Sequence, residues 1–158
     1  MKKIKHIGIY GIIIKNQKIV LINKVGGPYD KKLDLPWGTP KHGENLENTL
    51  KRELKEELGI KEEVKLKYIA ESFIKFPGNK KYHEVGFYFL VKINEEKYNY
   101  KDNKIYNSLD EEHDGKSEFI WIDKNNLKNY KIMPNILIEK INNLKDNNIV
   151  EHIVYKEY

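Results

Sequence analysis

The sequence predicts an α/β fold in which a mixed β-sheet packs between helices. Two patterns predict it. Apolar, β-branched runs typical of strands lie on both sides of a stretch in which leucine recurs every fourth residue, as on one helical face. A second helical pattern follows the last of the longer strands. The order is therefore strands, helix, strands, helix, and a sheet covered by helices buries these apolar faces.

The first third of the chain reads as a β-hairpin followed by loops. Ile7 to Ile14 and Lys18 to Asn23 are strand-like, and polar residues 15–17 form the turn between them. Residues 25–30 are rich in glycine and proline and predict a loop. A short extended piece is expected at Leu33 to Leu35, before a second loop that runs from Gly38 to Gly43.

The leucine pattern predicts a helix from Asn45 to Leu58. Its apolar positions all lie on one face, because four residues are close to one helical turn. Gly59 follows the last leucine, where a left-handed helix terminus favours glycine. The helix is expected to be held to the core by Leu46, Leu50, Leu54 and Leu58.

The second half returns to strands. Val64 to Phe76 and Glu84 to Ile93 have strand composition, with a turn at 77–79, and Glu95 to Gly115 reads as a long irregular loop. Phe119 to Ile122 is a short predicted strand.

The C-terminal part is expected to be helical and then extended. Asp123 can cap a short helix through Asn129. Pro134 lies near the first turn of a second helix, whose apolar residues are Ile136, Leu137, Ile141 and Leu144. Residues 149–158 are expected to add an edge strand or to fray.

Length and composition indicate one globular domain spanning residues 1–158. Apolar residues make up 39% and charged residues 34% of the chain, which fits a soluble protein with a charged surface. There is no cysteine, so disulfides and thiolate metal sites are excluded, which fits a cytoplasmic, reducing compartment. The apolar run behind the N-terminal lysines is too short for a membrane span.

The formal charge of +5 arises from 29 basic and 24 acidic residues. One interpretation is attraction to polyanions. The other is a lysine-rich solvated surface, and this is favoured because no run reaches five consecutive basic residues. Nucleic acid is therefore the less favoured partner.

Three glutamates of the predicted helix converge. Glu53, Glu56 and Glu57 stand at i, i+3 and i+4, on one side of the helix. Carboxylates this close repel one another unless a cation lies among them, and Mg²⁺ prefers carboxylate and phosphate oxygens. A solvated acidic face is the alternative, and the glutamates alone would favour it.

Arg52, beside this cluster, has two possible partners. It can pair with Glu56 one turn later, or reach back to Glu44 and brace the preceding loop against the helix. We favour the bracing role, because a guanidinium binds a carboxylate well through two hydrogen bonds. Gly38 and Gly43 allow that loop to turn sharply and to approach other groups closely.

From Gly38 to Ile60 the sequence reads Gly-x5-Glu-x7-Arg-Glu-Leu-x-Glu-Glu-x-Gly-Ile. This resembles the signature of the Nudix hydrolases, the MutT-related family, at every specified position. The resemblance implies a Nudix-type α/β/α sandwich with a mixed β-sheet between helices. It also implies hydrolysis of a nucleoside diphosphate linked to another group, with Mg²⁺ or Mn²⁺ as cofactor and more than one ion when substrate is bound.

The same resemblance assigns roles to residues of the signature. It implies that Glu53, Glu56 and Glu57 are metal ligands, that Arg52 braces the site with Glu44, and that Gly38 lies in the loop at the metal and substrate. Many members carry two glycines after Leu-Pro. Here Trp37 takes the first place, where it either packs in the core or offers a ring to a base.

A further carboxylate from outside the signature often completes such sites. Glu118 is our first choice as a catalytic and metal-binding residue, because Glu118-x-x-Trp121 resembles a pattern of the family. Glu111, Glu112 and Asp114 are alternatives in the preceding loop. All of these side chains can equally be ordinary surface carboxylates.

Substrate contacts are harder to predict. Lys41 can bind a phosphate, Tyr29 can stack on a base, and His83 can contact a phosphate or transfer a proton. Each of these side chains can instead have an ordinary structural or surface role. Strand aromatics in particular usually belong to the core. The same holds for Lys24, Lys51, Phe76, Tyr82 and Tyr88.

The sequence thus predicts a metal-dependent nucleotide pyrophosphohydrolase with a small-molecule nucleotide substrate. Attack of a metal-activated water on phosphorus is the expected reaction. A catalytically silent nucleotide sensor of the same fold is the alternative, although such a protein would not need all three glutamates. Nucleoside triphosphates, ADP-ribose, dinucleoside polyphosphates, nucleotide sugars and RNA 5′ ends all stay open as substrates, and a homodimer is possible.

Overall fold

The described residues form a nine-stranded mixed sheet with helices on both faces. The computed structural model describes residues 3–24, 33–76, 78, 80–94, 96–98, 105–107, 117–130, 132 and 134–157. The strands are β1 (Lys3–Lys15), β2 (Lys18–Lys24), β3 (Leu33–Asp34), β4 (Trp37–Gly38), β5 (Val64–Phe76), β6 (Lys80–Lys92), β7 (Ile105–Asn107), β8 (Ser117–Asp123) and β9 (Glu151–Glu157). The helices are α1 (Leu46–Leu58), the 3₁₀ helix η1 (Lys124–Asn129) and α2 (Ile136–Asn142).

The main path of the sheet runs β7-β8-β2-β1-β6-β5-β9, with β3 paired to β2 and β4 paired to β1. β1 pairs with β6, and β5 with β9, in parallel, whereas the other pairs are antiparallel. The predicted hairpin, the mixed sheet and the edge strand near the C-terminus are therefore confirmed. The apolar β-branched runs form strands because their branched side chains pack well on a pleated surface.

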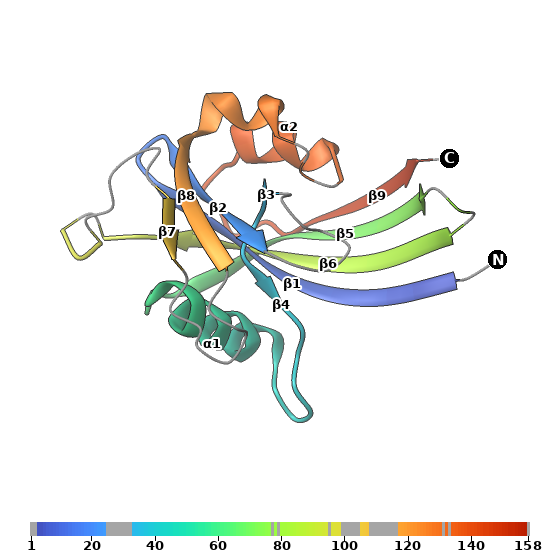
Figure 1. Ribbon diagram of the computed structural model, residues 1–158, viewed down its shortest axis with the longest axis horizontal. Helices are drawn as coiled ribbons and strands as arrows, with labels where there is room; N and C mark the ends of the chain where they lie inside the picture. Colours follow the sequence, from blue (N-terminus) through green and yellow to red (C-terminus); the bar gives the residue numbers. More distant parts are fainter. Residues whose placement is uncertain are drawn as a thin grey trace.

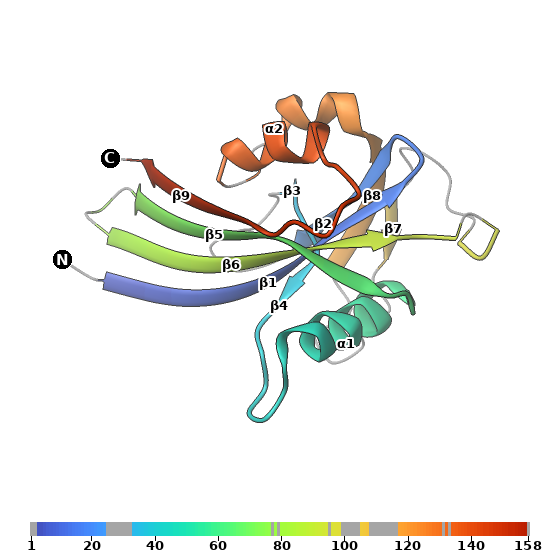
Figure 2. The same cartoon turned by 180° about the vertical axis from the view of Figure 1, so that it is seen from behind.

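Helices cover both faces of the sheet (Figure 1; Figure 2 gives the reverse view). α1 lies on one face, and η1 with α2 lies on the other. Each face has its own core cluster. Leu50, Leu54 and Leu58 of α1 pack with Ile9 on one side, and residues such as Ile141 of α2 pack on the other. We call these the α1 face and the α2 face. The predicted sandwich is thus confirmed.

The signature helix begins and ends as its sequence predicts. Asn45 has an extended backbone, and its side-chain Oδ1 accepts a hydrogen bond from the Asn48 amide at 2.8 Å. Gly59 has φ of 66°, in the left-handed region, and its amide donates to the Lys55 carbonyl at 3.1 Å. The helix therefore starts one residue later than predicted, since Asn45 caps it.

Several boundaries differ from prediction. β6 starts at Lys80 rather than Glu84, because pairing with β5 extends the ladder beyond the apolar run. The segment expected to be an irregular loop contains β7, three residues paired with β8, which had no hydrophobic pattern to reveal it. The predicted loop at 25–30 lies outside the described residues.

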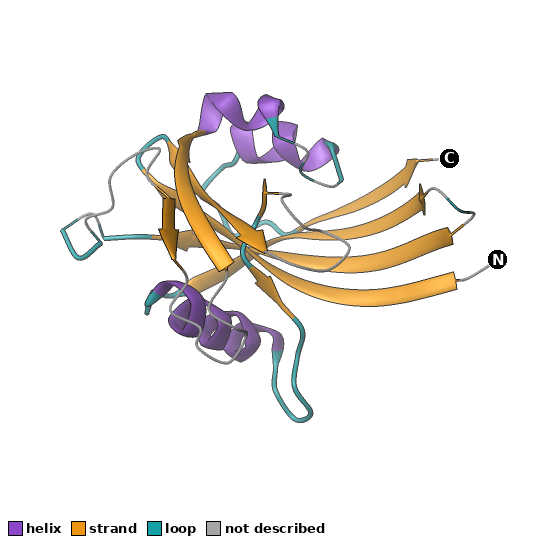
Figure 3. Cartoon of the chain, viewed as in Figure 1, coloured by secondary structure: helices purple, strands orange, loops and turns teal. Residues whose placement is uncertain are grey.

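Four strands reach beyond the helices. Figure 3 shows β1, β5, β6 and β9 running on past α1 and α2 to one end of the molecule. We call this part the sheet extension, and it consists of residues 3–8 of β1, 70–76 of β5, 80–86 of β6, and β9. Its side chains alternate between the two faces, as in any strand.

Candidate active site

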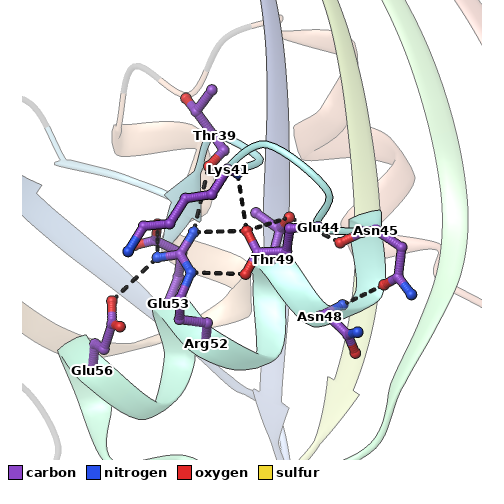
Figure 4. A network of polar contacts seen from close by, with 9 residues as sticks. All are labelled: Thr39, Lys41, Glu44, Asn45, Asn48, Thr49, Arg52, Glu53 and Glu56. Atoms are coloured by element: carbon purple, nitrogen blue, oxygen red, sulfur yellow. Dashed lines mark hydrogen bonds and ion pairs between the residues drawn. The ribbon is translucent and has the colours of Figure 1, made fainter.

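Arg52 is the centre of a polar network on α1 (Figure 4). Its Nε and Nη2 donate to the two carboxylate oxygens of Glu44 at 2.9 and 3.0 Å, a two-bond pairing of high specificity. Its Nη1 donates to Glu53 at 2.7 Å and to Glu56 at 3.2 Å. The predicted brace to Glu44 is confirmed, and the alternative pair with Glu56 is formed as well.

Glu44 fixes the loop to the start of the helix. Its Oε2 also accepts hydrogen bonds from the Lys41 amide at 3.1 Å and from the Thr49 hydroxyl at 3.0 Å. The hydrogen bond from Arg52, followed by that of the Lys41 amide, lowers the pKa of Glu44 from 4.5 to about 2. Glu44 is therefore charged at every physiological pH and anchors the loop.

Gly38 allows the loop to approach the first glutamate. Gly38 pairs with Ile9 of β1, on the α1 face, and its backbone lies directly against Glu53. A methyl group at this position would overlap Cγ and Cδ of Glu53. Only glycine therefore permits the side chain of Glu53 to occupy its place beside the strand.

The three glutamates differ in burial. The Glu56 side chain is 44% exposed and that of Glu53 is 17% exposed, whereas Glu57 as a residue is only 4% exposed. Glu57 shares the buried side of α1 with Leu50 and Leu54. Glutamate is rarely buried to this degree unless it is paired. The three exposures together show a row of carboxylates that runs from the surface to the helix–sheet interface.

The donor chemistry of this row suits a hard divalent cation. Oxygens of Glu53 and Glu56 already converge on a single cationic atom, Nη1 of Arg52. Carboxylate oxygens are the ligands that Mg²⁺ and Mn²⁺ prefer. As the side chains stand, the described residues contain no group of three or more acidic, histidine or cysteine side chains that could hold a metal. Binding of a metal by all three glutamates would therefore require their side chains to move closer together.

Lys41 and Trp37 lie near this network in different ways. Lys41 contributes its backbone amide to Glu44, and Figure 4 shows its side chain extending along the side of the helix that carries Glu53 and Glu56. Trp37 alternates with Gly38 and points to the α2 face, where its ring contacts His6 and Tyr10 at centroid distances of 5.4 and 6.1 Å. The half-buried Trp37 thus packs against the α2-face core.

Other predicted residues do not join the network. Glu118 lies in β8, where it pairs with Asn23 of β2 on one side and with Asn107 of β7 on the other. Its neighbours Phe119 and Trp121 belong to the α1-face core, so Glu118 starts from the opposite face. This placement does not support our choice of Glu118, because a single-residue spacing determines the face of a strand.

His83 also lies apart from the signature helix. It is four residues along β6 from Phe87, which packs beside α1, and its ring stacks on Phe73 at 4.3 Å. A contact of His83 with substrate stays a prediction. Tyr29, Glu111, Glu112 and Asp114 lie outside the described residues.

Two features were missed by sequence reasoning. Thr49 is fully buried and holds Glu44, and only its position five residues after Glu44 could have indicated this. On the α2 face, the Tyr10 hydroxyl donates a hydrogen bond to Glu84, which is 8% exposed. Burial raises the pKa of Glu84 above its usual range despite that hydrogen bond. No local pattern marks this pair.

An open depression of about 620 Å³ lies elsewhere, between η1 and α2. Its lining residues, among them Lys128 and Asn142, belong to the α2 face. It is therefore separated from the acidic row of α1 by the sheet, and we assign the candidate site to α1.

Fold and site together define an α/β/α sandwich with an arginine-braced acidic helix behind a glycine loop. Residues 4–137 match the NUDIX domain family model, and the chain belongs to this family. No curated protein matches the chain. None of the described helices is long and apolar enough to cross a membrane.

Solved structures of the family share the fold. The MutT protein of Bacillus halodurans is 18% identical, with a TM-score of 0.65 over 95% of this chain and 88% of that one. The MutT Nudix hydrolase of Burkholderia pseudomallei is 20% identical, with a TM-score of 0.56 over 77% and 84%. The Nudix domain of Shewanella oneidensis NrtR, crystallised with ADP ribose, is 15% identical, with a TM-score of 0.62 over 89% and 88%.

Proposed function

We propose that this chain hydrolyses the pyrophosphate linkage of a nucleoside di- or triphosphate derivative with the help of Mg²⁺ or Mn²⁺. The observation that carries the proposal is the convergence of Glu53 and Glu56 on one cationic atom, beside a glycine that admits no side chain. Such a row of oxygens suits a cation that in turn binds phosphates. The products would be a nucleoside monophosphate and a phosphorylated remainder, or pyrophosphate from a triphosphate.

In this proposal Glu53, Glu56 and Glu57 would hold the metal, and the backbone at Gly38 keeps Glu53 in its place. A bound divalent metal would neutralise phosphate charge and lower the pKa of a coordinated water. Glu57, at the buried end of the row, lies where water is most excluded and where a charge interacts most strongly. The exposed Lys41 is proposed to attract a substrate phosphate.

Arg52 has a double part in this proposal. Two of its nitrogens are committed to Glu44, whereas Nη1 lies between Glu53 and Glu56. The first pair of contacts keeps the loop in place. The second holds the two carboxylates together in the absence of metal, and this lowers the electrostatic cost of a preformed site.

The experiment is a panel of nucleoside triphosphates, ADP-ribose, dinucleoside polyphosphates and nucleotide sugars, with Mg²⁺ or Mn²⁺. Phosphate is scored after coupling to a phosphatase, with EDTA as a metal-free control. We expect metal-dependent product from at least one class. Glu57→Gln should lower turnover by roughly 10³-fold, since it removes several kcal/mol of charge stabilisation.

Glu47→Gln is the matched control, because Glu47 lies on the same helix, exposed and outside the network. Its turnover should equal that of the wild type. Full activity of Glu57→Gln at saturating metal would exclude the proposed mechanism.

A nucleotide sensor is the second candidate. The fold likeness extends to Shewanella oneidensis NrtR, whose Nudix domain was crystallised with ADP ribose and which was also crystallised with a 27mer DNA. At 14–15% identity this likeness concerns the fold alone. Calorimetry with ADP-ribose separates the two candidates, because saturable binding without product over a long incubation would favour the sensor.

A further inference from the structure

The α1 face of the sheet extension gathers lysines from all four strands. Lys81 and Lys75 are directly opposite each other in the β6–β5 ladder. In the next row on this face, Lys5 pairs with His83 and Lys156 pairs with Phe73. All four lysines are exposed. Strands lie about 4.8 Å apart, so this group spans about 14 Å from β1 to β9.

Acidic groups are scarce on this face. Across these rows and the next row inward, the registers place one carboxylate, that of Glu71. Glu71 is already contacted by His152 Nε2 at 2.9 Å and by His83 Nε2 at 3.7 Å. No ion pair joins Lys5, Lys75 or Lys156 to a carboxylate of the described chain. The positive charge of these three lysines is therefore not neutralised by a carboxylate of the described residues.

Two aromatic side chains lie among these lysines. Phe73 and His83, on neighbouring strands, stack at 4.3 Å with an interplanar angle of 18°. The Lys156 ammonium lies 5.8 Å from the centre of the Phe73 ring. Both rings are half-buried between the strands, and exposed Ile7 lies beside them in the row towards α1.

The other face of the extension has a different character. Its corresponding rows carry Tyr82, Ile74, Glu84 and Tyr155, with exposed Lys80 and Glu157 of opposite charge at the edge. The excess of positive charge is thus a property of the α1 face, not of the extension as a whole.

We propose that the α1 face of the sheet extension binds single-stranded nucleic acid. Lys5, Lys75, Lys81 and Lys156 would contact backbone phosphates, and the Phe73–His83 pair would receive a base. A basic surface that carries aromatic side chains is the combination that binds single strands irrespective of sequence. An anionic membrane is less well matched, because both aromatic side chains are half-buried.

The lysine face and the candidate active site lie on the same face of the sheet. Lys5 is four residues from Ile9, which pairs with Gly38, so about 13 Å of β1 separates the two. A strand bound here can therefore extend towards the acidic helix. Binding itself does not depend on hydrolysis, so the proposal stands apart from the proposed enzymatic activity.

The test is fluorescence anisotropy with a labelled single-stranded RNA of about 12 nucleotides, within the length range that such surfaces cover. The triple variant Lys5→Gln, Lys75→Gln, Lys156→Gln is compared with Lys61→Gln, Lys128→Gln, Lys145→Gln, which changes the charge equally at exposed lysines elsewhere. We expect the first variant to lose about tenfold or more in affinity. Its slope of log affinity against log salt should fall by about 2, at about 0.7 per lost phosphate contact.

Equal weakening by both triple variants would show non-specific charge attraction and overturn the proposal. So would wild-type binding to phosphatidylserine vesicles without binding to RNA. If the first triple variant does not fold, Lys75→Gln alone should still lower the salt slope by about 0.7, and an unchanged slope would overturn the proposal.

The aromatic pair is tested separately with Phe73→Leu, which keeps an apolar side chain. Affinity for the RNA should fall by about fivefold or more, because stacking on the ring is lost. Affinity for long-chain inorganic polyphosphate, which has no bases, should stay unchanged. An equal loss for both probes would overturn the role of the ring.

Discussion

Glu44 and Glu84 show how differently one residue type is used in two regions of this molecule. Glu44, in the loop before α1, is held by a guanidinium, an amide and a hydroxyl, which lower its pKa to about 2. Glu84, on the α2 face of β6, is buried with the Tyr10 hydroxyl as its hydrogen-bond partner, and its pKa is raised. The first environment stabilises a charge for a site, whereas the second tolerates a carboxyl group in a core.

Glycine supports both regions in the same way. Gly38 makes room for Glu53, and Gly8 makes room for the Tyr10 ring and Glu84. The space at Gly38 serves the candidate active site, whereas the space at Gly8 serves the packing of the α2-face core. Filling the space at Gly38 should therefore reduce activity, and filling the space at Gly8 should reduce stability.

Among the variants that test this comparison, Gly38→Ala has the largest expected effect. The new methyl group must displace Glu53, and a shift of about 1 Å in a catalytic group can cost about 10²-fold in turnover. Steady-state kinetics on the best substrate measures it. Gly11→Ala, whose new methyl group would meet its nearest neighbour at an ordinary 3.4 Å, is the control for adding a methyl group to a strand glycine. Comparable losses in both variants would contradict a specific role for Gly38.

Gly8→Ala should act on stability instead. Its Cβ would lie 2.8 Å from Glu84 Oε1 and closer still to the Tyr10 ring, which is stacked on Tyr88 and has little freedom to move. Overpacking of this kind costs about 1–3 kcal/mol. Urea unfolding should show this loss, with turnover nearly unchanged at a temperature where the variant is folded.

Gly11→Ala, in the same strand, has its nearest contact at 3.4 Å and serves as the control. A loss of stability as large as that of Gly8→Ala would assign the effect to strand glycines in general rather than to the Tyr10–Glu84 pair.

Arg52→Lys separates charge from geometry. A lysine keeps the charge but cannot donate two parallel hydrogen bonds to Glu44 while contacting Glu53. We expect about 1 kcal/mol less unfolding free energy, a modest value because the network is partly solvated, and about tenfold lower turnover. Lys51→Arg, whose exposed pair with Glu63 contributes little, should change neither quantity. Wild-type turnover in Arg52→Lys would show that the brace is dispensable.

The pH dependence of Glu44 is the next test. Its pKa is about 2 in the folded state and near 4.5 in the unfolded chain, so its stabilising contribution is complete above pH 4.5 and is lost as the pH falls towards 2. The difference in unfolding free energy between wild type and Glu44→Gln should therefore shrink over this interval. A difference that stays constant with pH would contradict the lowered pKa.

Glu84 should show the opposite sign. Because its folded pKa is raised, the folded state binds more protons above pH 4.5, and the wild type loses stability relative to Glu84→Gln as the pH rises through the raised pKa. Denaturation at a series of pH values measures both variants. If the difference in unfolding free energy from the wild type changed with pH in the same direction for Glu44→Gln and Glu84→Gln, the two carboxyl groups would not differ as proposed.

Much of the fold followed from local patterns. The leucine period and Gly59 predicted α1 to within one residue, and Val64–Phe76 was predicted with its exact ends. β7 and the start of β6 were missed, because their positions depend on partners far away in the chain. Three strand residues without an apolar pattern carry no local signal.

The residues of the candidate site were likewise predicted only in part from the sequence. Arg52, Glu44 and the glutamates of α1 lie within one loop and one helix, so helical geometry alone brings them together. Glu118 and His83 were chosen from other segments, and the structure places both apart from the network. Successive residues of a strand point to opposite faces of the sheet. The face on which a residue lies relative to a site therefore cannot be predicted without the strand register.

The sequence by itself thus determined the family, the helix and its acidic row, because these rest on contacts between residues a few positions apart. Only the tertiary structure decided the burial of Glu84 under Tyr10, the close approach of Gly38 to Glu53, and the lysine face of the sheet extension. Lys5, Lys75, Lys81 and Lys156 are dispersed along the sequence and form no basic run. They meet because strand pairing joins distant segments at a fixed register, with side chains of every second residue on the same face.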